Sequence, residues 1–168
     1  MAIARLHADS WRRHYRGAYA DAFLNGDVDG DRLAIWTERL REPDPRSRTI
    51  LAETGEGLIG FAHTIFEEDP RWGALLDNLH VVSGEKRRGI GSRLLALTAE
   101  AVLERRTGLY LWVLEQNLDA RAFYEARRGR CVERVPVPPP GGVACRLKGS
   151  PIGLRYAWPN PALALYPE

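Results

Sequence analysis

Hydrophobic residues recur at helical spacing near the start of the chain. From residue 2 to residue 24 the apolar side chains fall near one face of a helix, and Asn25 followed by Gly26 predicts its end. Aromatic residues follow one another at a spacing of four within it: Trp11, Tyr15, Tyr19 and Phe23. Because such a row packs into a core more often than it lines a substrate site, we interpret it as core. A second helix is expected over residues 33–40.

From residue 49 onward, strand patterns alternate with helical ones. Strands over 49–53 and 58–66 are expected to form a hairpin. The remaining expected elements are strand 75–82, helix 90–106, strand 109–114, helix 118–128, strand 129–135, an irregular proline-rich loop over 136–142, strand 152–158 and a tail over 159–168. This order predicts an α/β fold, with a central twisted mixed sheet flanked by helices. The third and fourth strands are expected to run parallel through a right-handed crossover.

Composition excludes several classes of protein. The 168 residues are 45% hydrophobic, which predicts one domain over residues 1–168. A net charge of +2 is too small to indicate nucleic-acid binding, and no apolar run approaches the ~18 residues of a membrane span. Cys131 and Cys145 lack metal-ligand spacing, and the N-terminus lacks the apolar stretch of a signal peptide. We therefore expect a cytoplasmic protein without a metal, nucleic-acid or membrane partner.

A basic, glycine-containing turn joins a predicted strand to a predicted helix at residues 81–95, V-V-S-G-E-K-R-R-G-I-G-S-R-L-L. Three cations at 86–88 precede Gly89 and Gly91, and the helical pattern begins at once. The first N–H groups of a helix lack internal partners and attract anions, and glycine lets a phosphate approach the backbone. The turn therefore predicts a phosphate or pyrophosphate site. Its spacing fits neither the P-loop G-x-x-x-x-G-K-[ST] nor the dinucleotide pattern G-x-G-x-x-G.

Two motifs resemble those of the GNAT N-acetyltransferase superfamily. Residues 86–91, K-R-R-G-I-G, are similar to its coenzyme A turn [QR]-x-x-G-x-[GA], with lysine in the first slot. Residues 117–124, N-L-D-A-R-A-F-Y, match N-x-x-A-x-x-F-Y in every slot. The motifs occur in the expected order with one helix between them, and the resemblance covers roughly residues 48–130. The family usually opens with a strand before its first helix, and that strand is expected to be absent here.

The resemblance implies an N-acetyltransferase that moves an acetyl group from acetyl-CoA, a co-substrate used without a metal, to a primary amine. Direct attack would pass through a tetrahedral intermediate, with a backbone N–H near Val81 holding the oxyanion. The family splays the third and fourth strands apart, so that the pantetheine arm enters between them. Tyr124 matches the tyrosine that protonates the leaving thiolate in many members, and Asn117 should contact pantetheine or cap the next helix. The expected co-substrate-binding residues are Leu79, Val81, Lys86, Arg87, Arg88, Gly89, Ile90, Gly91, Ser92, Asn117, Ala120 and Tyr124.

The base that removes the amine proton is left open among three residues. In the family a carboxylate on the strand before the phosphate turn, or a water that it holds, often serves, but that slot is Leu75 here. Glu115 and Asp77 rank ahead of His80. Strand alternation places Asp77 on the face of Leu79 and His80 on the other, so Asp77 and His80 are not expected to face the cleft together.

The acceptor amine is not identified by either motif, and both a small molecule and a peptide are compatible with the sequence. Its binding is expected to involve the first two helices and the loops at 67–73 and 136–142. The proline-rich loop and the last strand are compatible with a homodimer. The alternative to an enzyme is a non-catalytic acyl-CoA-binding module, which the missing glutamate at position 75 favours and Tyr124 disfavours.

Overall fold

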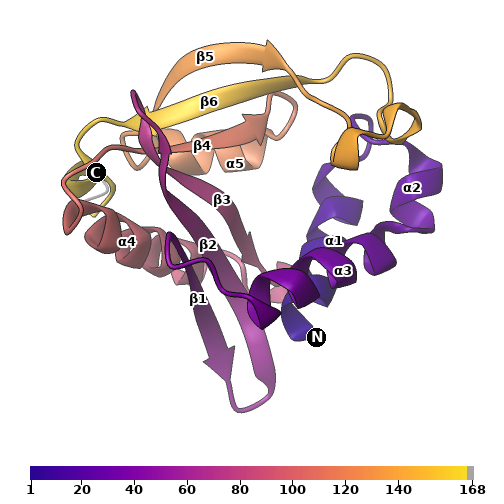
Figure 1. Cartoon of the computed structure of the whole chain (residues 1–168), viewed down its shortest axis with the longest axis horizontal. Coiled ribbons are helices and arrows are strands. Elements are labelled where there is room, and N and C mark those ends of the chain that lie inside the picture. The colour runs from indigo at the N-terminus through magenta and orange to yellow at the C-terminus, as the bar shows by residue number, and fades with distance from the viewer. Residues whose placement is uncertain (166–168) are drawn as a thin grey trace.

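Six strands form one mixed sheet with helices on both faces (Figure 1). The computed structural model describes residues 1–165, so the end of the predicted tail over 159–168 lies outside the described residues. In chain order the helices and strands are α1 (Ala2–His14), α2 (Asp21–Asn25), α3 (Val28–Arg41), β1 (Ser47–Thr54), β2 (Gly57–Asp69), β3 (Gly73–Val81), α4 (Ile90–Leu103), β4 (Leu109–Leu114), α5 (Leu118–Glu125), β5 (Arg130–Pro136) and β6 (Ile152–Trp158). The predicted α/β class with a mixed sheet is confirmed, and β4 and β6 have the predicted bounds.

The first predicted helix is two helices in the structure. The prediction of one helix over residues 2–24 is wrong, because α1 ends at His14 and α2 begins only at Asp21. Gly17 lies between them with a φ of +87°, a left-handed conformation that favours glycine and ends helices. Arg12 and Arg13 occupy the last turn of α1, where their positive charges interact favourably with the helix dipole. α1 contacts β3, and its Ser10 hydroxyl is hydrogen-bonded to His80 of that strand.

β3 and β4 lie next to each other but pair over only two residues. Parallel pairs join Ala74 to Leu109 and Leu75 to Tyr110, and the described strands are not paired with each other beyond these positions. On their other sides, β3 pairs with β2 up to its end and β4 pairs with β6 along its whole length. The predicted splay between these two strands is confirmed. The sheet order is β1-β2-β3-β4-β6-β5, and within residues 1–165 no strand precedes α1.

A bulge in β3 changes which of its side chains share a face. Consecutive residues of β2 pair with Leu76 and Asn78, so Asp77 between them has no partner. Leu76 and Leu79 consequently pack against the same core cluster. The expectation that alternation separates Asp77 from His80 is therefore wrong, since an extra residue shifts the alternation by one position.

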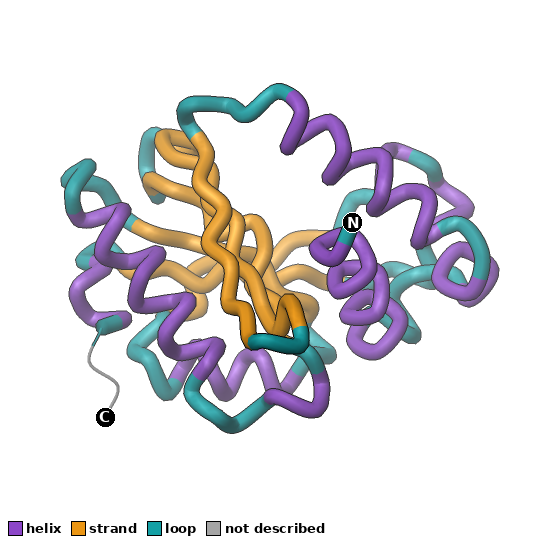
Figure 2. The backbone as a smooth tube through the Cα atoms, turned by 90° about the horizontal axis from the view of Figure 1, so that it is seen from below, coloured by secondary structure: helices purple, strands orange, loops and turns teal. Residues whose placement is uncertain are grey.

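Apolar side chains pack on both faces of the sheet, as the two layers of helices in Figure 2 indicate. The larger cluster joins the sheet to α4 and α5 and includes Leu95 and Trp158, both fully buried. The opposite cluster joins α1 and α3 to β2 and includes Trp36 and Phe61, also fully buried. Burying each such side chain contributes roughly 1.5–3 kcal/mol. The C-terminal end of β3 is thus enclosed by helices of both layers.

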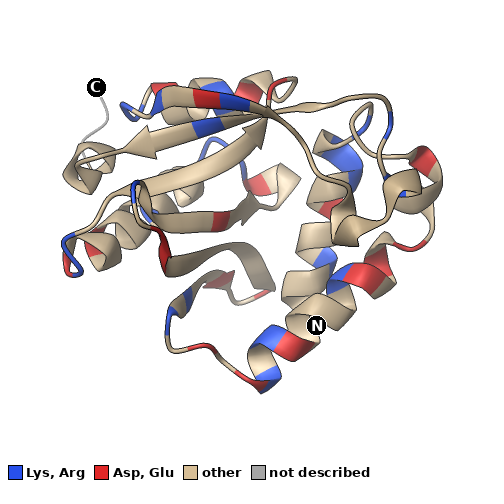
Figure 3. Cartoon of the chain, turned by 45° about the horizontal axis from the view of Figure 1, so that its top comes forward, with Lys and Arg blue, Asp and Glu red and all other residues tan. Residues whose placement is uncertain are grey.

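Other features of the described chain bear on the classes considered from composition. No helix within residues 1–165 is long and apolar enough to cross a membrane, and no group of three or more His, Cys, Asp or Glu in that range could hold a metal ion. Cys131 and Cys145 are free and exposed. Acidic and basic residues are interspersed over the helices and strands visible in Figure 3, in keeping with the net charge of +2.

Candidate active site

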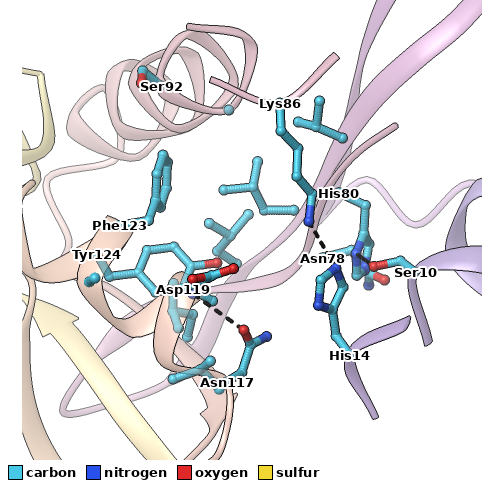
Figure 4. Close-up of a pocket in the computed structure, with 18 of the residues that line it drawn as sticks. Ser10, His14, Asn78, His80, Lys86, Ser92, Asn117, Asp119, Phe123 and Tyr124 are labelled. Carbon is cyan, nitrogen blue, oxygen red and sulfur yellow. Dashed lines mark hydrogen bonds between the residues drawn. The ribbon is translucent and has the colours of Figure 1, made fainter. Parts of the chain in front are cut away.

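A cavity of about 710 Å³ opens where β3 and β4 diverge. Its walls come from α1, the second half of β3, the turn that precedes α4, the middle of β4 and helix α5 (Figure 4). Both sequence motifs therefore border one cavity. The side of β3 that faces it is not covered by β4 after Leu75, so backbone N–H and C=O groups of this strand are available to a ligand.

The turn before α4 presents backbone donors. Gly89 is the N-cap residue of α4 and has a φ of +81°, a conformation that favours glycine. Helical bonding begins at Arg93, whose N–H donates to the Gly89 carbonyl at 2.9 Å. The N–H groups of residues 90–92, in the first turn, therefore have no intrahelical partner. Gly89, Gly91 and Ser92 line the cavity, so this positive helix end borders it.

The cations around the turn have different partners. Arg88 pairs with Glu85 at 2.5 Å, and Lys86 contacts His14 of α1, with 2.9 Å between Nζ and Nε2. Figure 4 shows Lys86 reaching from the turn to His14. Arg127, which follows α5, donates to the Ser92 hydroxyl, and its guanidinium lies 3.8 Å from the centre of the Phe123 ring. Burial lowers the pKa of Arg127, which lines the cavity as an additional cation.

Helix α5 positions the second motif. The Asn117 side chain accepts a hydrogen bond from the Ala120 N–H at 3.3 Å, which confirms that it caps the helix. Tyr124 is 8% exposed, and its ring lies edge-on to Phe123 and Trp158, with centroid distances of 5.2 and 6.0 Å. Burial raises the pKa of Tyr124 well above its usual range, so its hydroxyl stays protonated at neutral pH.

Of the three candidate bases, two lie in the cleft. Asp77 lines the cavity and pairs with Arg39 of α3 at 2.8 Å. His80 also lines it and shares a 2.7 Å hydrogen bond between its Nδ1 and the Ser10 hydroxyl. Burial, together with the charges of nearby cationic groups, lowers the pKa of His80 to about 3, so the ring is neutral.

Glu115 lies apart from these two. Both of its carboxylate oxygens accept hydrogen bonds from Arg134 of β5, at 2.9 and 3.0 Å. The Arg134 hydrogen bond lowers the pKa of Glu115. Glu115 is not among the residues that border the cavity in the described chain, so the structure does not bring it together with Tyr124.

Most of the predicted co-substrate residues border the cavity. Those that line it are Leu79, Val81, Lys86, Arg87, Gly89, Gly91, Ser92, Asn117, Ala120 and Tyr124. Arg88 and Ile90 do not; they lie on the neighbouring surface beside the β1–β2 turn. The Ile90 side chain packs against the core cluster under α4.

Sequence reasoning expected the first helix to take part in acceptor binding, but it did not identify which of its residues line the cavity. Ser10, His14 and Tyr15 line it, as does Trp112 of β4. The aromatic row predicts a core position for Tyr15, which packs against the buried cluster of Trp11, Tyr19 and Phe23 and also borders the cavity. The signal available in the sequence was Gly17, which ends α1 and leaves Tyr15 at the helix terminus instead of in its interior.

A splayed parallel strand pair with a helix N-terminus at its mouth is the arrangement expected of the GNAT fold. The comparison with known families gives the same answer, because residues 4–129 match the Acetyltransferase (GNAT) family. The chain belongs to this family and is a GNAT-type acyltransferase.

Two curated relatives support the assignment. The chain is 29% identical over 128 residues to "Uncharacterized N-acetyltransferase YuaI" of Bacillus subtilis, with 74% of this chain and 70% of the relative covered. It is 30% identical over 134 residues to "Probable N-acetyltransferase Rv2775" of Mycobacterium tuberculosis, with 74% and 71% covered.

Solved structures share the fold. PaiA N-acetyltransferase from Thermoplasma acidophilum, in complex with coenzyme A, superposes with a TM-score of 0.65 at 19% identity, covering 93% of this chain and 91% of that one. The ribosomal-protein-S18-alanine N-acetyltransferase from Escherichia coli gives 0.61 at 18% identity, covering 94% and 86%. Nourseothricin acetyltransferase gives 0.55 at 25% identity, covering 71% and 69%.

Proposed function

We propose that the protein transfers an acetyl group from acetyl-CoA to a primary amine. The observation that carries the proposal is the divergence of β3 from β4 after two paired residues. It leaves one cavity bordered by the free N–H groups of α4, the unpaired side of β3 and the Tyr124 side chain. These three features fit, in that order, a ligand with an anionic end, an amide-containing arm and a reactive tip.

The pyrophosphate is proposed to lie on the backbone N–H groups of residues 87–92, with Lys86 and the two arginines that follow it supplying positive charge. The amides of the pantetheine arm are proposed to pair with the unpaired side of β3 near Leu79 and Val81, as an added strand would. The Asn117 amide nitrogen and the start of α5 at Ala120 complete the arm's binding site. A backbone N–H near Val81 is proposed to hold the oxyanion.

Two side chains are proposed to handle protons. Acetyl-CoA supplies an acyl group on a thiolate leaving group, and the protonated Tyr124 hydroxyl is the donor for the departing sulfur. Asp77, which lines the cavity, is proposed to take the proton of the amine, directly or through a water. Glu115 does not border the cavity in the described chain, and for it we propose a structural role in which its pairing with Arg134 links β4 to β5.

The acceptor is proposed to be an amine of a small molecule or of a peptide. Nourseothricin acetyltransferase and the S18-alanine N-acetyltransferase, both similar in fold, are named for acceptors of these two kinds. We propose that the chain acts as one domain, since α1 and the sheet both contribute walls to the cavity.

The test is the release of free thiol from acetyl-CoA in the presence of primary amines, with Tyr124→Phe as the variant. The variant keeps the buried ring and removes only the hydroxyl, so acetyl-CoA affinity should persist. Because a positioned acid contributes about 10²–10⁴-fold, kcat should fall by at least ~100-fold. An unchanged kcat would remove Tyr124 from this role. A non-catalytic acyl-CoA-binding module would bind acetyl-CoA and release no thiol with any amine.

A further inference from the structure

Tyr15 is a second tyrosine that lines the cavity, and it comes from a different helix than Tyr124. It is the C-cap residue of α1 and lines the cavity, whereas Tyr124 comes from α5. Figure 4 shows Ser10 and His14, the neighbouring α1 residues, across the cavity from Tyr124. The two tyrosines therefore approach the space between the strands from different helices.

The Tyr15 ring is held in place on several sides. It stacks on Trp11, with centroids 5.2 Å apart and planes inclined by 23°, and it lies 4.9 Å from the Tyr19 ring. The Tyr15 N–H donates to the Trp11 carbonyl at 2.9 Å, and its own carbonyl accepts from the N–H groups of Ala18 and Tyr19 at 3.0 and 2.9 Å. The position of the hydroxyl is thus fixed before any ligand arrives, which is the condition for an orienting group.

The Tyr15 hydroxyl has hydrogen-bonding capacity that the protein does not use. Within residues 1–165 it makes no hydrogen bond, whereas the Ser10 hydroxyl of the same cavity wall is paired with His80. Burial, with the nearby Tyr19, Tyr124 and Asp77 groups, raises the pKa of Tyr15 above its usual range, so the phenol stays neutral. A neutral phenol offers one donor and two acceptor positions, and polar groups in such surroundings usually find a partner.

We infer that Tyr15 is an acceptor-binding residue, whose hydroxyl oxygen accepts a hydrogen bond from the N–H of the primary amine and orients the nitrogen toward the acyl carbon. The inference rests on the proposed acetyl transfer. The two tyrosines then have different roles: Tyr124 donates a proton to the leaving sulfur, and Tyr15 binds the incoming amine nitrogen.

Tyr15→Phe tests this assignment, with Tyr19→Phe as the matched control. Both changes remove one oxygen from the same ring stack, but Tyr19 does not line the cavity. Thiol release would be measured with phenethylamine, spermidine and a peptide with a free N-terminal alanine, varying amine and acetyl-CoA separately. Loss of one hydrogen bond should lower kcat/KM for the amine about tenfold in Tyr15→Phe. The KM for acetyl-CoA should not change, and Tyr19→Phe should match the wild type.

The outcomes separate this inference from the function on which it rests. Wild-type turnover together with an equally active Tyr15→Phe variant would overturn the role of Tyr15 and leave acetyl transfer intact. A Tyr15→Phe variant that loses acetyl-CoA affinity in calorimetry as well would also overturn it, since the hydroxyl would then not be specific to the amine. A wild-type protein that binds acetyl-CoA but releases no thiol with the three probes would overturn the proposed function itself, and this inference with it.

Discussion

Two buried histidines and one partly buried histidine predict that the fold loses stability steeply as the pH falls below 6. His7 and His63 are 3% and 4% exposed, and His80 is partly buried beside the cavity. Burial, with nearby positive charge, lowers the pKa of His63 to about 4 and that of His80 to about 3, and it lowers the pKa of His7 further still. A hydrogen bond gives an independent reason why the folded His7 ring is neutral, because its Nδ1 accepts the indole N–H of Trp36 at 2.9 Å. An indole can only donate, so this nitrogen carries no proton in the folded state.

The magnitude follows from proton linkage. The unfolded chain binds a proton at each of these histidines below its ordinary pKa of 6.5, whereas the folded chain does not. The free energy of unfolding therefore falls as the pH falls, by about 1.4 kcal/mol per pH unit for each histidine. The three together give about 4 kcal/mol per pH unit between pH 6 and 5, a large share of a typical stability of about 5–15 kcal/mol.

Urea denaturation at pH 7.0, 6.0, 5.5 and 5.0, followed by tryptophan fluorescence, measures this slope. His63→Asn is the internal control: it removes one titrating group and should reduce the slope by about 1.4 kcal/mol per pH unit. A wild-type slope at or below that of one histidine, about 1.4 kcal/mol per pH unit, would refute the reasoning.

Two further changes test the motifs. Gly89→Glu should lower acetyl-CoA affinity at least ~100-fold in calorimetry, because it adds strain at a φ of +81° and a negative charge at the helix end. The control, Gly55→Glu in the exposed β1–β2 turn, should bind acetyl-CoA normally. Equal affinities of the two variants would show that the turn before α4 does not hold the phosphates. Asn117→Ala removes the α5 cap and should reduce the free energy of unfolding by about 1 kcal/mol in urea denaturation, and a change below ~0.3 kcal/mol would mean that the cap contributes little.

Local sequence patterns were sufficient to predict the structure of segments that depend only on neighbouring residues. β4 and β6 have the predicted bounds because each is an apolar run bordered by turn-forming residues. The glycine turn could be recognised because a helix N-terminus needs only neighbouring residues to create its free donors. The break after α1 was also encoded locally, at Gly17, but the aromatic row around it favoured a continuous helix.

Features that depend on a distant partner could not be predicted in the same way. The bulge at Asp77 is a mismatch with β2, which strand periodicity alone does not reveal. Glu115 ranked high as a base because of its place before Asn117, and only the fold brings Arg134 to its carboxylate. Tyr15 has the same sequence signature as a core aromatic, and its position in the cavity depends on where α1 ends.

The central claim is that acetyl-CoA binds between β3 and β4, with its phosphates on the start of α4. The most direct measurement is thermal unfolding of the wild-type protein without acetyl-CoA and with a series of concentrations up to ~100 times the dissociation constant. Binding predicts a gain of about 2.7 kcal/mol at the highest concentration, which raises the Tm by roughly 5–10 °C for a chain of this size. A Tm that does not change across the series would contradict the account.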